Sequence, residues 1–252
     1  MNGKNNEFNF VLAINRKKIT EINVLLQELI RVLFPEITPS SEIKAWKNHY
    51  KQKTDVLIKV GNTIKKISIK MGSRNSVHVE HVSTFIEFMR LNNIPEEVIN
   101  NYLYYHYGDD TLDGSGVKRL DSSLLKDKYK REIDEINLYF NNKKLIIKAI
   151  DRFVLKGLVF HDYVDAIVVG TPDDFLFIKR DEVYKIILDK KDKYCSAPHF
   201  GPLVCQSFGR CLNYNKRYEW NRNFVQVKWY SLFDDIVEHM NKQSLKSDNV
   251  GP

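Results

Sequence analysis

Three side chains whose types suit phosphate chemistry fall on one short stretch of this chain. Residues 54–70, TDVLIKVGNTIKKISIK, contain Asp55, Ser68 and Lys70. A carboxylate can bind Mg²⁺, which prefers oxygen ligands and keeps several waters. A lysine beside that metal can stabilise charge on a phosphate or orient the attacking water. The first hypothesis is therefore metal-assisted attack on a phosphate ester.

The element that must position these side chains is a predicted hairpin. Two β-forming runs flank Gly61-Asn62, a pair that suits a two-residue turn. With that turn Asp55 falls opposite Ser68, and Lys70 shares their face because side chains alternate along a strand. A one-residue slip would separate Asp55 from Lys70, so the chemistry depends on the turn.

The same turn makes Val60 the partner of Thr63 and defines a second, apolar face of the hairpin. That face carries Val56, Ile58, Ile67 and Ile69. We expect it to pack on the core. A plain amphipathic hairpin with a solvated polar face is the alternative, because an Asp and a Lys at this spacing are common.

A second carboxylate follows the hairpin. Residues 72–76 predict a loop that contains Arg74, and apolar residues at helical spacing predict a helix over 77–91. Glu80 would lie in its first turns, just beyond the strand that carries Lys70. The alternative for Glu80 is an acid that stabilises the start of a helix.

Asp55, a hairpin and Ser68-Ile69-Lys70 together resemble the core of the PD-(D/E)XK restriction-endonuclease-like nucleases. Thr54 stands where that motif has proline, and Ser68 stands where it has a second acid. Some restriction enzymes of this superfamily have serine there and take the acid from the following helix. The resemblance therefore implies that Asp55, Ser68, Lys70 and Glu80 are catalytic. It also implies an α/β fold, with a small mixed sheet flanked by helices.

The resemblance further implies an acid from an early helix. Residues 20–34 predict such a helix, in which Glu21 and Glu28 lie on one face. We take Glu28 as the candidate that would join Asp55 and Glu80 around Mg²⁺, for which Mn²⁺ could substitute. A solvated helix face is the alternative for both early glutamates.

Composition limits the class of protein. The chain has 252 residues, a net charge of +7, 43% hydrophobic and 28% charged residues, which is typical of a globular protein with a polyanionic partner. No apolar run approaches the roughly 18 residues that cross a membrane, and the N-terminus lacks the apolar centre of a signal peptide. Three cysteines without such a signal favour the cytoplasm.

The chain is expected to divide near residue 120. Residues 1–120 would form the nuclease core, and 121–252 a helical segment and an added αβ lobe, in one continuous globular unit. Gly108–Gly116 predicts an exposed polar loop, and the tail from Lys242 is expected to fray. Further helices are predicted over 122–139, 143–155, 181–188 and 232–240. Further strands are predicted over 164–169, 175–178, 203–208 and 224–229.

Basic and aromatic residues interleave over 206–230. Lys and Arg neutralise phosphates, while Arg and Gln can read base edges. The resemblance implies base recognition by the added lobe. The candidate DNA contacts are Arg74, Gln206, Arg210, Arg222, Gln226 and Lys228. A solvated basic strand pair whose aromatics fill the core explains the same pattern.

Four residues have side chains of the types that bind zinc, namely Cys195, His199, Cys205 and Cys211. They lack the close Cys-x₂₋₄-Cys spacing of structural zinc sites, and Cys205 lies in an apolar strand. The sequence alone does not decide whether these residues bind zinc.

These observations lead to one principal expectation. The chain is expected to be a Mg²⁺-dependent, sequence-specific endonuclease that hydrolyses double-stranded DNA as a homodimer, without a membrane partner. The alternatives are a non-catalytic DNA-binding protein on a degenerate nuclease fold, and a nuclease for RNA or branched DNA.

Overall fold

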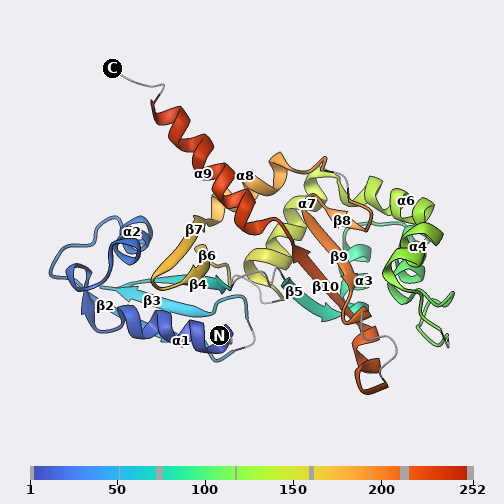
Figure 1. Cartoon of the computed structure of the whole chain (residues 1–252), viewed down its shortest axis with the longest axis horizontal. Helices are drawn as coiled ribbons and strands as arrows, with labels where there is room; N and C mark the ends of the chain where they lie inside the picture. The colour runs from blue at the N-terminus through green and yellow to red at the C-terminus, as the bar shows by residue number, and fades with distance from the viewer. Residues whose placement is uncertain are drawn as a thin grey trace. The chain divides into compact units, whose positions relative to one another are not determined.

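The computed structural model describes residues 3–50, 52–71, 76–116, 118–158, 162–193, 195–210 and 216–248. Its chain forms two compact units, each built from separate segments (Figure 1). Unit 1 comprises Met1–Asn75, Val154–Ile186 and Ser231–Pro252, and unit 2 comprises Ser76–Phe153 and Ile187–Tyr230. The expected division near residue 120 differs from this arrangement, because that position lies inside unit 2.

Six strands of the described chain form a mixed sheet in unit 1. Their order is β1 (Lys17–Lys18), β2 (Glu42–Lys47), β3 (Val56–Val60), β4 (Thr63–Lys70), β6 (Ala166–Thr171) and β7 (Asp174–Lys179). Strands β4 and β6 run parallel, and the other neighbours run antiparallel. The predicted strands at 164–169 and 175–178 are confirmed with small changes at their ends, whereas β2 was not predicted.

The hairpin β3–β4 has the predicted register. Val60 pairs with Thr63, and Val56 pairs with Ile67. The backbone N–H of Asp55 donates to the Ile67 carbonyl at 2.9 Å, which continues the ladder by one residue. The apolar face is also confirmed, because Val56, Ile58 and Ile67 are fully buried and Ile69 is nearly so.

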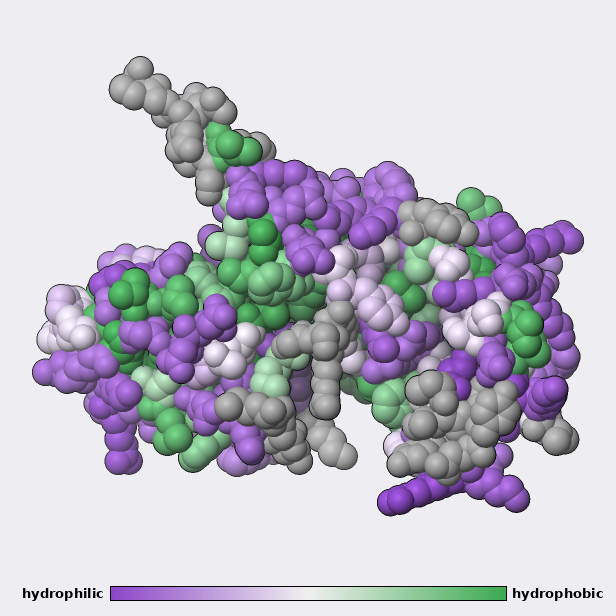
Figure 2. Space-filling model, viewed as in Figure 1, coloured by the Kyte–Doolittle hydropathy of each residue, from purple (hydrophilic) through white to green (hydrophobic). Residues whose placement is uncertain are grey.

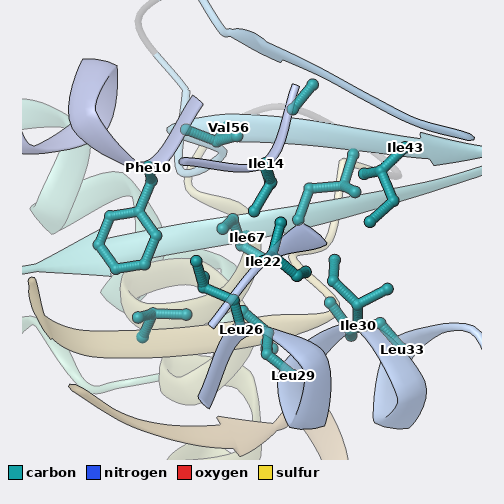
Figure 3. Packing of buried hydrophobic residues seen from close by; sticks show 14 of the residues in the cluster. Phe10, Ile14, Ile22, Leu26, Leu29, Ile30, Leu33, Ile43, Val56 and Ile67 are labelled. Atoms are coloured by element: carbon teal, nitrogen blue, oxygen red, sulfur yellow. The ribbon is translucent and has the colours of Figure 1, made fainter. Parts of the chain in front are cut away.

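Two helices cover that apolar face, α1 (Gly3–Ile14) and α2 (Val24–Leu33). Figure 3 shows Phe10 of α1 and Leu26 of α2 in one cluster with Ile67. Each large apolar side chain removed from water contributes about 1.5–3 kcal/mol. The helix predicted over 20–34 begins later than expected. A short 3₁₀ turn, η1 (Ile19–Glu21), precedes it, and the Asn23 side chain caps α2 by accepting from the Leu26 N–H at 2.9 Å.

In the part of the chain that the structure describes, the opposite face of the sheet is covered over only part of its width. Over β6 and β7 it buries Ile167 and Ile178, and α9 (Leu232–Asp248) contacts β7. Over β2 and β4 it leaves Trp46 and Ile64 exposed. Helix α9 also corrects an expectation, because the chain beyond Lys242 continues as helix rather than fraying at that point.

Four strands of the described chain form the antiparallel sheet of unit 2. Their order is β5 (Ser76–His81), β10 (Phe224–Trp229), β9 (Leu203–Ser207) and β8 (His199–Phe200). The predictions for β9 and β10 are confirmed. The helix predicted over 77–91 is wrong at its start, since 76–81 is a strand and α3 is Val82–Leu91. Val77 and Val79 favour a strand that pairs with β10, and the His81 side chain caps the helix at Ser83.

Helices α3, α4 (Glu96–Tyr107), α6 (Lys130–Phe140) and α7 (Lys143–Ala149) and the 3₁₀ helix η4 (Lys216–Asn223) contact strands of this sheet. The remaining helices of the described chain that lie wholly or partly in unit 2 are α5 (Ser122–Lys128), the π-helix η2 (Ile150–Lys156) and α8 (Arg180–Asp189). The predicted helix over 122–139 is broken at Tyr129, and the one over 143–155 becomes a π-helix at Ile150. The core is aromatic, with Phe140 stacked on Phe200 at 4.1 Å. In Figure 2, hydrophilic residues form most of the visible surface of unit 2.

Candidate functional site

The hairpin brings Asp55, Ser68 and Lys70 together as its register requires. Asp55 Oδ2 accepts hydrogen bonds from Ser68 Oγ at 3.1 Å and from the Ile69 backbone N–H at 2.6 Å. Lys70 Nζ lies 3.9 Å from the same oxygen. The Asp55 and Lys70 side chains are each 21% exposed, so a small ligand can reach both.

The hydrogen-bonding pattern leaves one carboxylate oxygen open. Among the described residues, the three contacts of Asp55 all use Oδ2 and none uses Oδ1. Ser68 is fully buried and donates its hydroxyl to Asp55, so it orients the carboxylate. Oδ1 is thus the atom of this hairpin that is best placed for a metal, with Lys70 as the adjacent cation.

Glu80 lies in a different setting from the one predicted. It sits on β5 of unit 2 and pairs with Val225 of β10, on the face that packs against the helices. Its side chain is 2% exposed and accepts from Arg152 Nη2 at 2.8 Å, with His78 Nε2 at 3.1 Å. A buried carboxylate needs such partners, so within unit 2 Glu80 takes part in an internal ion pair.

The two early glutamates of the predicted helix also take separate positions. Glu28 is exposed on α2, whose other side buries Leu29 and Ile30. Glu21 accepts from the Lys18 backbone N–H at 2.8 Å and so stabilises the turn before α2. The structure therefore places Glu28 on a solvated helix face, and no contact in the described residues joins it to Asp55.

An acid that sequence reasoning missed is Glu7 on α1. Its Oε2 lies 2.5 Å from Lys47 Nζ, and Lys47 is the strand partner of Val56, the residue after Asp55. Lys47 shares the face of Val56, so Glu7 lies on the helix-covered side of the sheet. The buried residues Asn6, Phe10 and Ile14 repeat every four positions, and this helical spacing could have revealed α1.

Four of the predicted DNA contacts, namely Gln206, Arg210, Gln226 and Lys228, line a groove of about 650 Å³ in unit 2. Gln206, Gln226 and Lys228 lie there on one face of β9 and β10, opposite the buried Val225 and Val227 as predicted. Gln206 Nε2 donates to Gln226 Oε1 at 3.2 Å. The Tyr230 hydroxyl donates to Gln206 Oε1 at 3.0 Å, and Lys228 Nζ lies 5.2 Å from the Tyr230 ring centre.

Arg210, another predicted contact, is tied to the protein interior. It donates to the carbonyls of Tyr105 at 3.0 Å, His106 at 2.6 Å and Leu120 at 3.1 Å. Burial lowers the pKa of this guanidinium, although it stays charged at neutral pH. Its contacts link the end of α4 to the segment before α5, which is a structural task.

Arg222, a further predicted DNA contact, is also bound to groups of the protein itself. Arg74, the remaining one, lies outside the described residues. Arg222 forms an ion pair with Asp109 and donates to the Gly116 carbonyl at 3.1 Å. Asp109 and Gly116 belong to the polar segment that was predicted to be an exposed loop. Its tip is exposed, but the Asp109 side chain is fully buried, so Arg222 anchors this loop.

The possible zinc ligands do not converge among the described residues. Cys205 is fully buried in β9, and burial raises the pKa of its thiol. His199 uses its two ring nitrogens with the Ala197 carbonyl at 2.8 Å and Asn141 at 3.2 Å. Cys211 lies outside the described residues. Within them, no three His, Cys, Asp or Glu side chains come close enough to share a metal. Mg²⁺ held by one or two carboxylates with waters needs no such group.

None of the helices in the described ranges combines the length and the apolar character that a bilayer crossing requires. No protein-family model matches the sequence, and no curated protein matches it.

Proposed function

We propose that this chain is a Mg²⁺-dependent DNA endonuclease on a PD-(D/E)XK-like core, for which Mn²⁺ can replace Mg²⁺. The observation that carries the proposal is the convergence of Ser68, Lys70 and the Ile69 N–H on one oxygen of Asp55. This arrangement holds the carboxylate rigid and leaves Oδ1 for a metal. The mixed sheet flanked by helices, with the hairpin at its centre, is compatible with the core that the resemblance implies.

In this proposal Asp55 binds the metal and Lys70 acts on the phosphate or on the attacking water. The metal would supply Lewis-acid activation of the phosphate, and waters would complete its coordination. Ser68 fixes the orientation of Asp55 through its hydroxyl. Glu80 can serve as the displaced acid only if its carboxylate exchanges Arg152 and His78 for the metal.

The proposed substrate is DNA with double-stranded segments. Gln206 and Gln226 present amide groups in the unit 2 groove, and amides of this kind pair with base edges. Sequence-specific cleavage of both strands takes two catalytic centres, so the proposal includes a homodimer.

The test is cleavage of several plasmid and phage DNAs with Mg²⁺, with Mn²⁺ or with EDTA. We expect discrete fragments that require metal and that disappear in Lys70→Ala and Asp55→Asn. Lys143→Ala, which removes an exposed lysine from α7, is the matched control and should cleave normally. Tight DNA binding without cleavage of any substrate would refute the nuclease.

A second function is favoured by a specific observation: neither position expected to supply a further acid offers a free carboxylate. Ser68 supplies a neutral hydroxyl, and Glu80 is paired with Arg152 in the interior of unit 2. This pattern supports a non-catalytic nucleic-acid-binding protein. That function predicts affinity that falls steeply with salt and is unchanged by Asp55→Ala.

A further inference from the structure

The described residues leave a region open beside Asp55, on the face of the unit 1 sheet that carries it. Ile43 and Ala45 of β2 are buried under the helices, so Lys44 and Trp46, which alternate with them, lie on the other face. Lys44 is exposed and Trp46 is 40% exposed. This region, made by Lys44, Trp46, Lys59 and Ile64, is called the open face below.

Two cross-strand rows define the open face. Lys44 pairs with Lys59, which pairs with Ile64, and Ile64 is 44% exposed. In the next row Trp46 pairs with Leu57, which pairs with Lys66. The surface thus combines the exposed indole of Trp46 with two lysines, Lys44 and Lys59, on neighbouring strands. The backbones of neighbouring strands lie about 4.8 Å apart.

The charges of the open face are complementary to a polyanion. Lys44 and Lys59 lie directly opposite one another, and like charges in that position repel. Neither forms an ion pair with a described residue, whereas Lys66 is paired with Asp162 at 2.5 Å. A phosphate bound between Lys44 and Lys59 would remove their repulsion.

The open face leads directly to the candidate catalytic centre. Leu57 lies two residues from Asp55 along the chain, so the row with Trp46 is about 6.6 Å from Asp55 along the strand. This is close to the span of one nucleotide in an extended strand. A strand that places a phosphate at Asp55 and Lys70 therefore places its neighbouring nucleotide at Trp46.

We propose that the open face binds an unpaired segment of DNA and presents it to Asp55 and Lys70. Lys44 and Lys59 would neutralise phosphates, and one base would stack on Trp46, as in proteins that bind single strands with basic grooves and aromatic platforms. In an intact duplex both faces of each base are occupied by stacking. The preferred substrate class is therefore DNA with a single-stranded or flapped segment. The cleavage step rests on the proposed function, but the binding does not.

The test measures binding of the full chain to labelled oligothymidylate by fluorescence anisotropy, in EDTA so that no cleavage occurs. Trp46→Ala should weaken binding roughly ten-fold, since stacking of one base contributes about that factor. Phe233→Ala removes a comparably exposed aromatic residue from α9 and should bind as the parent does. Equal affinity of Trp46→Ala and the parent would overturn the proposal.

The lysines provide a second measurement that does not depend on Trp46. Lys44→Gln and Lys59→Gln should each reduce the slope of log K against log salt by about 0.7, and Lys143→Gln should leave the slope unchanged. A duplex of the same sequence should bind more weakly to the open face, so its affinity should be insensitive to Trp46→Ala. An affinity for duplex that depends on Trp46, or preference for oligouridylate over oligothymidylate, would overturn the proposal.

The two proposals fail in different ways. If Trp46→Ala binds oligothymidylate as the parent does while metal-dependent cleavage is observed, only the proposal for the open face is refuted. Trp46-dependent binding without cleavage under any metal would refute the nuclease alone. Circular dichroism of each variant confirms folding, which Lys44→Gln is expected to retain because that side chain is exposed.

Discussion

Replacing Arg152 by methionine separates a structural from a catalytic role of Glu80. Arg152 Nη2 lies 2.8 Å from Glu80 Oε2, and the two side chains are 17% and 2% exposed. Arg152 also donates to the Thr84 carbonyl at 3.3 Å, so it joins β5 to the start of α3. Methionine keeps most of the side-chain volume and leaves the Glu80 carboxylate buried beside His78 alone.

The magnitude follows from the burial of the carboxylate. Removing one partner of a buried pair costs about 3–5 kcal/mol, because the other charge is left uncompensated. With a urea m-value of about 2 kcal/mol/M, the midpoint should fall by roughly 1.5–2.5 M. The double variant Glu80→Gln/Arg152→Met removes both charges and should recover most of this loss. A coupling free energy of about 2–3 kcal/mol would identify the pair as the cause.

Urea unfolding followed by tryptophan fluorescence is the assay. Trp229 is fully buried in β10, in the same sheet as Glu80, so it reports on unit 2. Trp46→Phe and Trp220→Phe in every protein leave Trp229 as the single probe. Asp134→Asn breaks the exposed pair with Lys130 and should change stability by less than about 0.5 kcal/mol.

Glu80→Gln provides the result that would refute this reasoning. A structural Glu80 predicts loss of stability, and cleavage that survives wherever the protein is folded. An unchanged urea midpoint together with abolished metal-dependent cleavage would identify Glu80 as a metal ligand.

Three further outcomes are expected. Burial lowers the pKa of His106 to about 3, so the unfolded chain takes up the proton first as pH falls. The contribution of neutral His106 to the free energy of unfolding should be fully present above pH ~6.5. It should fall by up to about 1.4 kcal/mol per pH unit as the pH is lowered toward 3. His106→Gln should flatten this part of the plot of urea midpoint against pH. Gly170 has φ +134, and an added Cβ would lie 2.2 Å from the Asp174 carbonyl oxygen. Gly170→Ala should therefore lower the free energy of unfolding, measured with urea, by about 2 kcal/mol or more. Gly61→Ala should lower it by only roughly 1 kcal/mol, because a Cβ added at Gly61 has no atom within 4 Å. Cys205 is fully buried with a raised thiol pKa, so mass spectrometry should find it alkylated only after unfolding, and labelling of the native protein would contradict its burial.

Features that depend on neighbours in sequence were predicted well. The hairpin register follows from Gly61, which adopts φ +56, and from strict alternation in β4, so the sequence alone is enough to predict that Asp55, Ser68 and Lys70 meet. The strand β5 was mistaken for the start of α3, because it enters the helix without a loop and its valines fit both periods.

Features that join distant parts of the chain were not predictable. Glu80 meets Arg152 across 72 positions, and Arg222 meets Asp109 across 113. In sequence, Arg222 and Arg210 look like any other basic residues beside aromatics, and only the fold shows that their donors are occupied internally. The pairing of Glu7 with Lys47 likewise needed α1 and β2, neither of which was predicted.

The parallel pairing of β4 with β6 has a consequence for synthesis and dissection of this chain. Ile67 pairs with Ala166, and the first segment of unit 2 lies between them in sequence. During translation, β4 therefore remains an open strand edge until β6 emerges, and such edges recruit other chains. A fragment that ends near residue 120 would keep that edge permanently and should aggregate. To isolate unit 1, residues 76–153 and 187–230 should be replaced by short flexible linkers, which preserves every strand of its sheet.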